Sequence, residues 1–192
     1  MFVTQHGVEL DKSKYSWDEK NKIFYTKENY LVLDFSNYRG VTFNTGYNCI
    51  FKTDSDCTFN TQDNCTFYTT DYCNFNTGNN CVFNTSNSCT FNTGHNCTFD
   101  TGNYCTFNTQ ENCTFKTSYH CYFKTGKNCF ITRYDVNGVI EIPANTKIKL
   151  NDFKIAGYIT KETKETTLNG KIVVIDGNEY ILQIKKTLSI DI

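Results

Sequence analysis

The chain has 192 residues, which is enough for one or two compact units with a sizeable core. Its 19 basic and 20 acidic side chains give a formal net charge of −1 and are spread along the whole length, so we expect neither nucleic acid nor an anionic membrane as a partner. The first twenty residues lack a basic segment followed by an apolar run, and no stretch approaches the roughly 18 apolar residues of a membrane span. We therefore expect a soluble chain without an export signal.

Residues 1–32 are expected to form an N-terminal cap. This segment contains the strand-like sequence "KIFYT", and "YLVLDF" follows after the polar turn "KEN". A sheet that begins here needs its first edge covered, because exposed strand edges recruit other chains. Trp17 and Phe24 are the side chains that we expect to plug this end.

Residues 33–136 consist of eight-residue units. Cysteine occupies every eighth position from Cys49 to Cys129, and the pattern Cys-x-Phe-x-Thr-x-x-x occurs ten times in full. "VTFNTGYN" at 41–48 has valine in the cysteine place, and "LDFSNYRG" at 33–40 reads as a degenerate unit with Leu33 in that place. In "CFITRYDV" at 129–136, Ile131 and Arg133 replace Phe and Thr. The array therefore fades at both ends, as terminal repeats usually do.

The alternation of Cys, Phe and Thr indicates short strands with these three side chains on one side. A helix would scatter them around its axis. The triplets between the strands are rich in Gly, Asn and Ser, which favour turns. The sequence therefore predicts an all-β solenoid. Its predicted core comprises Cys57, Phe59, Cys65, Phe67, Cys73, Phe75, Cys81, Phe83, Cys89, Phe91, Cys97, Phe99, Cys105 and Phe107.

The outward positions indicate two octads per coil. The fourth position of every other octad reads Asn44, Asn60, Asn76, Asn92 and Asn108, whereas the intervening octads are irregular there. A three-octad coil would erase this regularity. We therefore predict a two-sided parallel β-solenoid with two octads per coil and about six coils. Phe should face Phe across the middle, and Cys of one sheet should face Thr of the other.

Residues 137–192 are expected to form a small β-rich module that caps the last coil. The strand-like segments are "GVIEI", "TKIKL", "FKIAGYI", "KIVVID" and "EYILQI". "DGN" at 176–178 is typical of a hairpin turn, and the polar sequence "KETKETTLNG" at 161–170 is typical of a solvated loop.

The unit "CTFNTG" and the tail "RYDVNGVIEIPANTKIKLNDFKIAGY" resemble octad-repeat β-solenoid proteins of tailed bacteriophages and some bacteria. The resemblance covers about 41–160. It implies a viral or bacterial origin, a virion-associated or cytoplasmic location and a non-enzymatic role. It supplies no catalytic residue that could be transferred to this chain.

The eleven cysteines raise the question of metal binding, disulfides or catalysis. Zinc sites commonly use a short C-x(2–4)-C pair, which is absent here, and a column of parallel thiols does not converge on one ion. Stacked cysteines are close enough for disulfides, but their side chains should point in parallel. His120 should leave the core where Cys121 enters it, which argues against a catalytic dyad. We expect reduced, buried cysteines, no cofactor, no small-molecule substrate and no enzymatic activity, with the inward Thr hydroxyls satisfied by the turns or by the facing sheet.

The regular outward face is the predicted functional surface. It is flat and uncharged and contains Thr58, Asn60, Asn76, Thr90, Asn92, Thr106 and Asn108. One interpretation is a stabilising ladder of Asn amides; another is a docking surface for a protein partner or a second copy. The sequence favours a structural or binding protein, such as a phage decoration or fibre component. The alternatives are an ice-binding protein and a phage-encoded inhibitor of a host protein.

Overall fold

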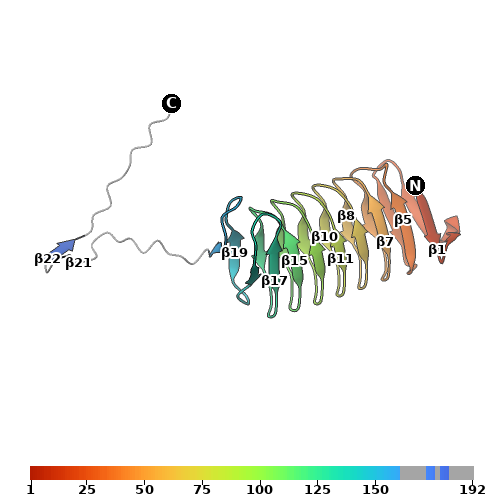
Figure 1. Cartoon of the computed structure of the whole chain (residues 1–192). Coiled ribbons are helices and arrows are strands. Elements are labelled where there is room, and N and C mark those ends of the chain that lie inside the picture. The colour runs from red at the N-terminus through yellow and green to blue at the C-terminus, as the bar shows by residue number, and fades with distance from the viewer. Residues whose placement is uncertain (161–171, 176–177, 182–192) are drawn as a thin grey trace, which may run out of the picture. The chain divides into compact units, whose positions relative to one another are not determined.

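The computed structural model describes residues 1–160, 172–175 and 178–181. The chain divides into two compact units, Met1–Thr160 and Lys161–Ile192. In the first unit, two ten-stranded sheets lie against each other as the two sides of a β-solenoid (Figure 1). The one helical segment described is the short 3-10 turn η1 (Lys12–Lys14), and no described helix is long or apolar enough to cross a membrane.

The strands alternate between the two sheets along the chain. In spatial order, sheet A contains β18 (Val139–Glu141), β17 (Phe130–Arg133), β15 (Thr114–Thr117), β13 (Thr98–Asp100), β11 (Val82–Asn84), β9 (Thr66–Tyr68), β7 (Ile50–Thr53), β5 (Leu31–Phe35), β1 (Phe2–Gln5) and β2 (Val8–Glu9). Sheet B contains β20 (Tyr158–Thr160), β19 (Lys147–Leu150), β16 (Tyr122–Lys124), β14 (Thr106–Asn108), β12 (Thr90–Asn92), β10 (Asn74–Asn76), β8 (Thr58–Asn60), β6 (Thr42–Asn44), β4 (Ile23–Thr26) and β3 (Tyr15–Asp18).

The predicted two-octad coil is confirmed by the strand register. In sheet B, Phe75 pairs with Phe91, and in sheet A, Phe83 pairs with Phe99, so each strand stacks on the equivalent strand two octads away. Each sheet has seven parallel strands, from β5 to β17 and from β4 to β16. The solenoid therefore has about seven coils rather than about six, because β4, which lies in the predicted cap, adds a parallel strand that completes a coil with β5.

The core is a double ladder of phenylalanine rings. Within a sheet the rings stack almost in parallel, as for Phe75 and Phe91 at 4.8 Å and 4°. Across the two sheets they meet edge to face, as for Phe83 and Phe91 at 5.2 Å and 76°. Every predicted core residue is at most 2% exposed. Burial of each ring contributes about 2–3 kcal/mol to folding.

The first coil corrects the assignment of residues 33–40. Leu33 pairs with Phe51 and Phe35 pairs with Thr53, so Leu31, rather than Leu33, occupies the cysteine place. The register is shifted because Val41 lies six positions after Phe35, whereas Cys57 lies four positions after Thr53. The predicted cap boundary at residue 32 thus falls inside β5, whose side chains Leu31, Leu33 and Phe35 are fully buried.

Antiparallel strands cover the first coil. β1 pairs with β5, and β3 pairs with β4. Phe24 is fully buried and contacts Phe43 at 6.2 Å between ring centroids. Trp17 packs edge to face on Phe35 at 5.6 Å. These contacts place both predicted plug residues at this end of the ladder.

At the other end, β18 pairs antiparallel with β17, and β19 pairs antiparallel with β16. The predicted strand "FKIAGYI" is wrong over most of its length, since residues 153–157 form a loop and only Tyr158–Thr160 is a strand. Arg133 donates hydrogen bonds to carbonyl groups of this loop and thereby holds it in place. In the second unit, β21 (Ile172–Ile175) and β22 (Asn178–Ile181) form the predicted hairpin, whereas the expected loop 161–170 lies outside the described residues.

Candidate interaction surface

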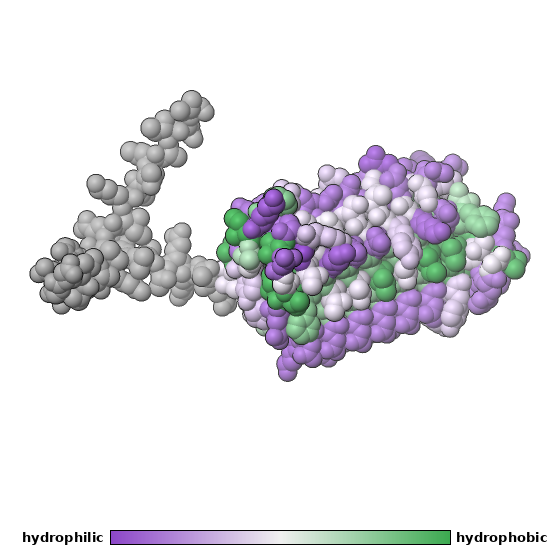
Figure 2. Space-filling model, in the orientation of Figure 1, coloured by the Kyte–Doolittle hydropathy of each residue, from purple (hydrophilic) through white to green (hydrophobic). Residues whose placement is uncertain are grey.

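Sheet B carries the predicted regular surface. Thr58, Asn74, Thr90 and Thr106 are in register from strand to strand, and beside them lies the Asn column. That column contains Asn44, Asn60, Asn76, Asn92 and Asn108, with Tyr25 before it and Lys124 after it. From β10 to β14 these side chains are exposed. Figure 2 shows a continuous hydrophilic band that runs lengthwise along one edge of the solenoid, from coil to coil.

Hydrogen bonds order the Asn amides. Asn60 Nδ2 donates to Asn44 Oδ1 at 2.9 Å, and Asn108 Nδ2 donates to Asn92 Oδ1 at 3.0 Å. Asn92 donates in the same way to Asn76 at 3.3 Å. The amide ladder considered from sequence is therefore formed in two parts, between Asn44 and Asn60 and from Asn76 to Asn108. It leaves one amide proton of each donor free of this bond, so the ladder and a docking surface can coexist.

The turns explain why the eighth octad position is also regular. Every residue just before a cysteine of the array has a positive φ: Asn48, Asp56, Asn64, Tyr72, Asn80, Ser88, Asn96, Tyr104, Asn112, His120 and Asn128. Asn tolerates this left-handed conformation better than other residues with a side chain. On the turns that lead from sheet B to sheet A the residue is always Asn, whereas the opposite turns use Asp, Tyr, Ser or His. Two further amide bonds, Asn96 to Asn80 and Asn128 to Asn112, extend along the first set.

A second ladder, absent from the sequence predictions, links the seventh octad positions. Asn79 Oδ1 accepts from the backbone N–H of His95 at 2.8 Å, and Asp63 Oδ1 accepts from that of Asn79 at 2.8 Å. The accepting oxygen occupies the space that a Cβ would need at Gly94 and Gly78. This explains why glycine occupies the sixth position of these two octads. The signal in the sequence is an Asn or Asp at the seventh position, which is followed one coil later by Gly at the sixth for Asp63 and Asn79 but by Ser86 for Asp71.

Two shallow hollows lie along the turns from sheet B to sheet A, one beside Gly78 and the other beside Gly46. One, of about 540 Å³, is lined by Tyr47, Thr61, Gln62, Asp63, Asn64, Asn76, Thr77 and Gly78. The other, of about 420 Å³, is lined by Tyr25, Thr26, Lys27, Asn29, Asn44, Thr45, Gly46, Tyr47, Asn60 and Gln62. Both are polar and open along the edge of the Asn column. They add two half-exposed tyrosine rings, Tyr25 and Tyr47, to the amide surface.

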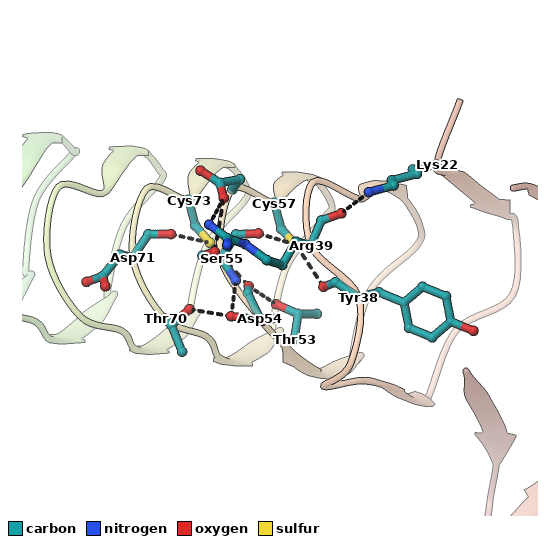
Figure 3. A network of polar contacts seen from close by, with 11 residues as sticks. Lys22, Tyr38, Arg39, Thr53, Asp54, Ser55, Cys57, Thr70, Asp71 and Cys73 are labelled. Carbon is teal, nitrogen blue, oxygen red and sulfur yellow. Dashed lines mark hydrogen bonds and ion pairs between the residues drawn. The ribbon is translucent and has the colours of Figure 1, made fainter. Parts of the chain in front are cut away.

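A polar network replaces the regular ladder on the opposite turns near the N-terminal end (Figure 3). Asp54 Oδ1 accepts from the backbone N–H of Ser55 at 2.7 Å and from the Thr70 hydroxyl at 3.2 Å. Arg39 forms an exposed ion pair with Asp56 at 2.8 Å, and its hydrogen bond lowers the pKa of that carboxyl group. The irregular triplet "DSD" is therefore satisfied locally, and these charges lie away from the Asn column.

The cysteines belong to the core. All eleven lie in the described part of the chain and are buried, as predicted, and none of them is paired in a disulfide. Each thiol of the array donates to a carbonyl two residues earlier, as Cys97 does to His95 O at 3.4 Å. Hydrogen bonding with Cys49 and burial outweigh the contact with Cys81 and raise the pKa of Cys65 to about 11. Such a thiol is protonated, and hence a poor nucleophile, at neutral pH.

The described residues do not bring together a metal-binding cluster. No group of three or more His, Cys, Asp or Glu side chains in the described ranges could hold a metal ion. His120 points away from Cys121, as expected from the alternation. It stacks on Tyr104 at 5.1 Å and lies 3.4 Å from Asp152 Oδ1, whereas Cys121 contacts Thr117 Oγ1 at 3.1 Å inside the core. This last contact also shows Cys facing Thr at a corner of the coil.

The inward threonines correct one prediction. The Thr117 hydroxyl donates to Gly102 O at 2.8 Å, but the hydroxyls of Thr45, Thr69, Thr77, Thr85 and Thr93 have no hydrogen-bond partner in the described structure. The expectation that turns or the facing sheet satisfy all of them is wrong for these five.

Comparison with known proteins adds no relative, since no family model matches the chain and neither a curated protein nor a solved structure matches it significantly.

Proposed function

We propose that this is a non-enzymatic binding protein, in which a rigid solenoid presents the Thr/Asn face of sheet B to a protein partner. The observation that carries the proposal is the hydrogen-bonded Asn ladder on an uncharged, in-register surface. The resemblance to octad-repeat phage proteins suggests an accessory role in a particle, as a decoration or fibre component.

Two physical arguments favour binding at this face. Side chains that are already ordered lose little conformational freedom when a partner arrives, so less of the interaction energy is lost. A neutral face also avoids the cost of burying unpaired charges at the centre of a contact. The Asn column offers amide donors and acceptors at the same spacing in every coil, which suits a partner that makes several equivalent contacts.

The test replaces two amides at the centre of the face. The double variant Asn76→Lys, Asn92→Lys introduces two exposed cations, and we expect it to fold but to lose the partner. The tagged protein is used to capture partners from a lysate of the source cells, and the captured protein is then purified and titrated against each variant. Asn84→Lys on sheet A is the matched control and should bind as the wild type does. Retained binding by the double variant would overturn the proposal.

Ice binding is the alternative that the in-register threonines Thr58, Thr90 and Thr106 favour, because flat Thr-rich arrays suit an ice surface. Thermal hysteresis at micromolar protein separates the two functions. We expect no hysteresis, since Asn74 interrupts the Thr column and the Asn amides are already bonded to each other. A hysteresis gap that Thr90→Tyr abolishes would replace protein binding by ice binding.

A further inference from the structure

The opposite face, on sheet A, carries an ordered pattern of charge. Six consecutive strands from β5 to β15 place one column of outward residues in register, and these residues are Asp34, Lys52, Tyr68, Asn84, Asp100 and Lys116. The column therefore reads negative, positive, neutral, neutral, negative, positive. The neighbouring outward column is uncharged and contains Val32, Ile50, Thr66, Val82, Thr98 and Thr114.

This face also exposes apolar surface. Ile50 is 38% exposed, Tyr68 is 49% and Val82 is 44%. Exposed aromatic and aliphatic side chains next to complementary charges are typical of interface centres with a polar surround. On sheet A, the charges lie toward the two ends of the column, and the neutral residues Tyr68 and Asn84 lie in its middle.

The charge pattern is complementary to itself when one copy is reversed. If a second copy faces sheet A with its coils running in the opposite direction, and the two-fold axis passes between β9 and β11, Asp34 lies opposite Lys116 of the other copy. Lys52 then lies opposite Asp100, and Tyr68 lies opposite Asn84. By symmetry each of these contacts occurs twice, so four ion pairs between the copies surround a neutral centre, and they adjoin the Lys116–Asp100 ion pair of 3.8 Å that each copy forms internally.

Other registers do not give this match. A shift of the axis onto β11 places Lys52 opposite Lys116, and a shift onto β9 places Asp34 opposite Asp100. A parallel arrangement about an axis along the solenoid sets the charged column on the apolar column, which would bury charges without partners. Like charges brought together across an interface oppose association, so the pattern selects one antiparallel register.

We propose that sheet A is the interface of a symmetric, antiparallel dimer of this protein, with its two-fold axis between β9 and β11. Such an interface is isologous, because each copy contributes the same surface. Six strands about 4.8 Å apart and about five residues wide cover roughly 29 by 16 Å. The two copies together would therefore bury on the order of 900 Å², which places the dimer among weak and transient complexes.

A charge exchange tests the register. Lys52→Asp places two carboxylates opposite each other at both symmetric contacts, and we expect it to weaken dimerisation about tenfold or more. Adding Asp100→Lys restores opposite charges across the axis, and we expect the double variant to recover most of the wild-type association. Sedimentation equilibrium from about 1 µM to about 1 mM protein measures all three association constants.

Controls keep the result specific. Asp100→Lys alone should weaken the dimer as Lys52→Asp does, and it replaces that variant if Lys52→Asp fails to fold. The sheet B variant Asn76→Lys, Asn92→Lys should dimerise like the wild type, so this proposal and the proposed partner surface fail independently. A wild type that stays monomeric up to about 1 mM, or a charge exchange that restores nothing, would overturn the dimer.

Discussion

Single residues are coupled between neighbouring coils. The side chain at the seventh position of one octad contacts the backbone of the equivalent octad in the next coil, at the sixth and seventh positions. At Gly94 this contact comes from Asn79, whose Oδ1 accepts from His95 N and lies where a Cβ would be. The effect of a substitution at Gly94 therefore depends on the neighbour in the previous coil, whereas at the equivalent site above Asp71, which makes the same bond to Asn87 N, Ser86 is accommodated.

Gly94→Ala should destabilise the fold by about 2–3 kcal/mol, because overpacking forces the turn or Asn79 to move. Adding Asn79→Ala should recover a large part of this loss, since the colliding oxygen is gone. Gln110→Ala is the control, because Gln110 occupies the same position one coil further on, where the preceding coil has His95 instead of Asn at the seventh position. This variant should stay within about 0.5 kcal/mol of the wild type. Urea titrations of the four proteins measure the coupling, and simple additivity of Gly94→Ala and Asn79→Ala would contradict it.

Removing a threonine hydroxyl should change the stability in opposite directions at Thr93, where the hydroxyl is unpaired, and at Thr117, where it is hydrogen-bonded. Thr93→Val removes a buried hydroxyl without a partner and should stabilise the protein by about 1 kcal/mol. Thr117→Val removes bonds to Gly102 O and Thr101 and a contact with Cys121, and should cost about 1–2 kcal/mol. Thermal melts of both variants decide the matter. Equal losses would mean that the Thr93 hydroxyl has a partner, such as a buried water.

At the scale of elements, the last coil ends in a buried ion pair. Arg133 stands where the repeat has threonine and bonds Asp135 at 2.5 Å, with both side chains at most 4% exposed. It also donates to the carbonyl oxygens of Asn151, Asp152 and Ile155. The guanidinium group thereby fixes the loop that follows β19 over the end of the core.

Arg133→Ala should cost about 3–5 kcal/mol, because it leaves the Asp135 carboxylate and three loop carbonyls without their donor in a buried site. The matched control is Arg39→Ala, which breaks the exposed pair with Asp56 and should cost less than about 1 kcal/mol. Chemical denaturation compares the two. Similar losses of stability in the two variants would show that the Arg133–Asp135 ion pair is accessible to water.

The elements that the sequence predicted correctly are those in which the same residue types recur at the same positions of every octad. Strict alternation of Cys, Phe and Thr determines which side faces inward, and the uniform Asn44-to-Asn108 series determines that a coil is two octads. The first coil escaped prediction because the turn 36–40 is two residues longer, which breaks the period although Leu31, Leu33 and Phe35 keep the alternation. The segment "FKIAGYI" has strand-like composition, but the bonds from Arg133 hold most of it as a loop.

The candidate surface was predicted as columns, yet its internal bonding was predicted only in part. Amides at the same position of alternate octads stack only if a coil contains two octads. The Asn column and its ladder could therefore be expected once that coil length was inferred. The coupling of Asn79 to Gly94 could not, because it depends on which atoms lie above a turn. The self-complementary charges on sheet A are likewise meaningless until Asp34 is brought into register with Lys52 by the longer first coil.

At the scale of the whole molecule, the buried thiols of Cys65 and Cys81 make stability depend on alkaline pH. Hydrogen bonds with neighbouring thiols, together with burial, raise the pKa of Cys65 and Cys81 to about 11, above the ordinary value of 9.0. A raised pKa means that the folded state retains protons that the unfolded state releases, so this contribution is complete below about pH 9 and is lost as the pH rises toward 11.

Between pH 8 and pH 10, each such thiol should therefore lower the free energy of unfolding by about 1 kcal/mol. Urea titrations at the two pH values measure the difference for the wild type and for Cys65→Ala, Cys81→Ala. The double variant should lose less between the two pH values, whatever its stability at pH 8. An equal loss in both proteins would show that the alkaline effect does not come from these two thiols.

Because a coil is two octads, alternate octads of the chain always belong to opposite sheets. Each coil contacts mainly its neighbours, so a duplication or deletion of two octads lengthens or shortens the rod by one strand spacing, about 4.8 Å, and leaves every outward column on its own side. A change of one octad would instead exchange the two sides beyond the break, joining the Asn column of sheet B to the charged column of sheet A. Recombination between repeats can thus change the length of the solenoid by whole coils without disturbing the outward columns. Gain or loss of a single octad would instead interrupt the columns of both sheets at the same point. Even a whole-coil event inside β7 to β13 would alter the separation between Lys52 and Asp100, so the length of the array and its ability to match a second copy are inherited together.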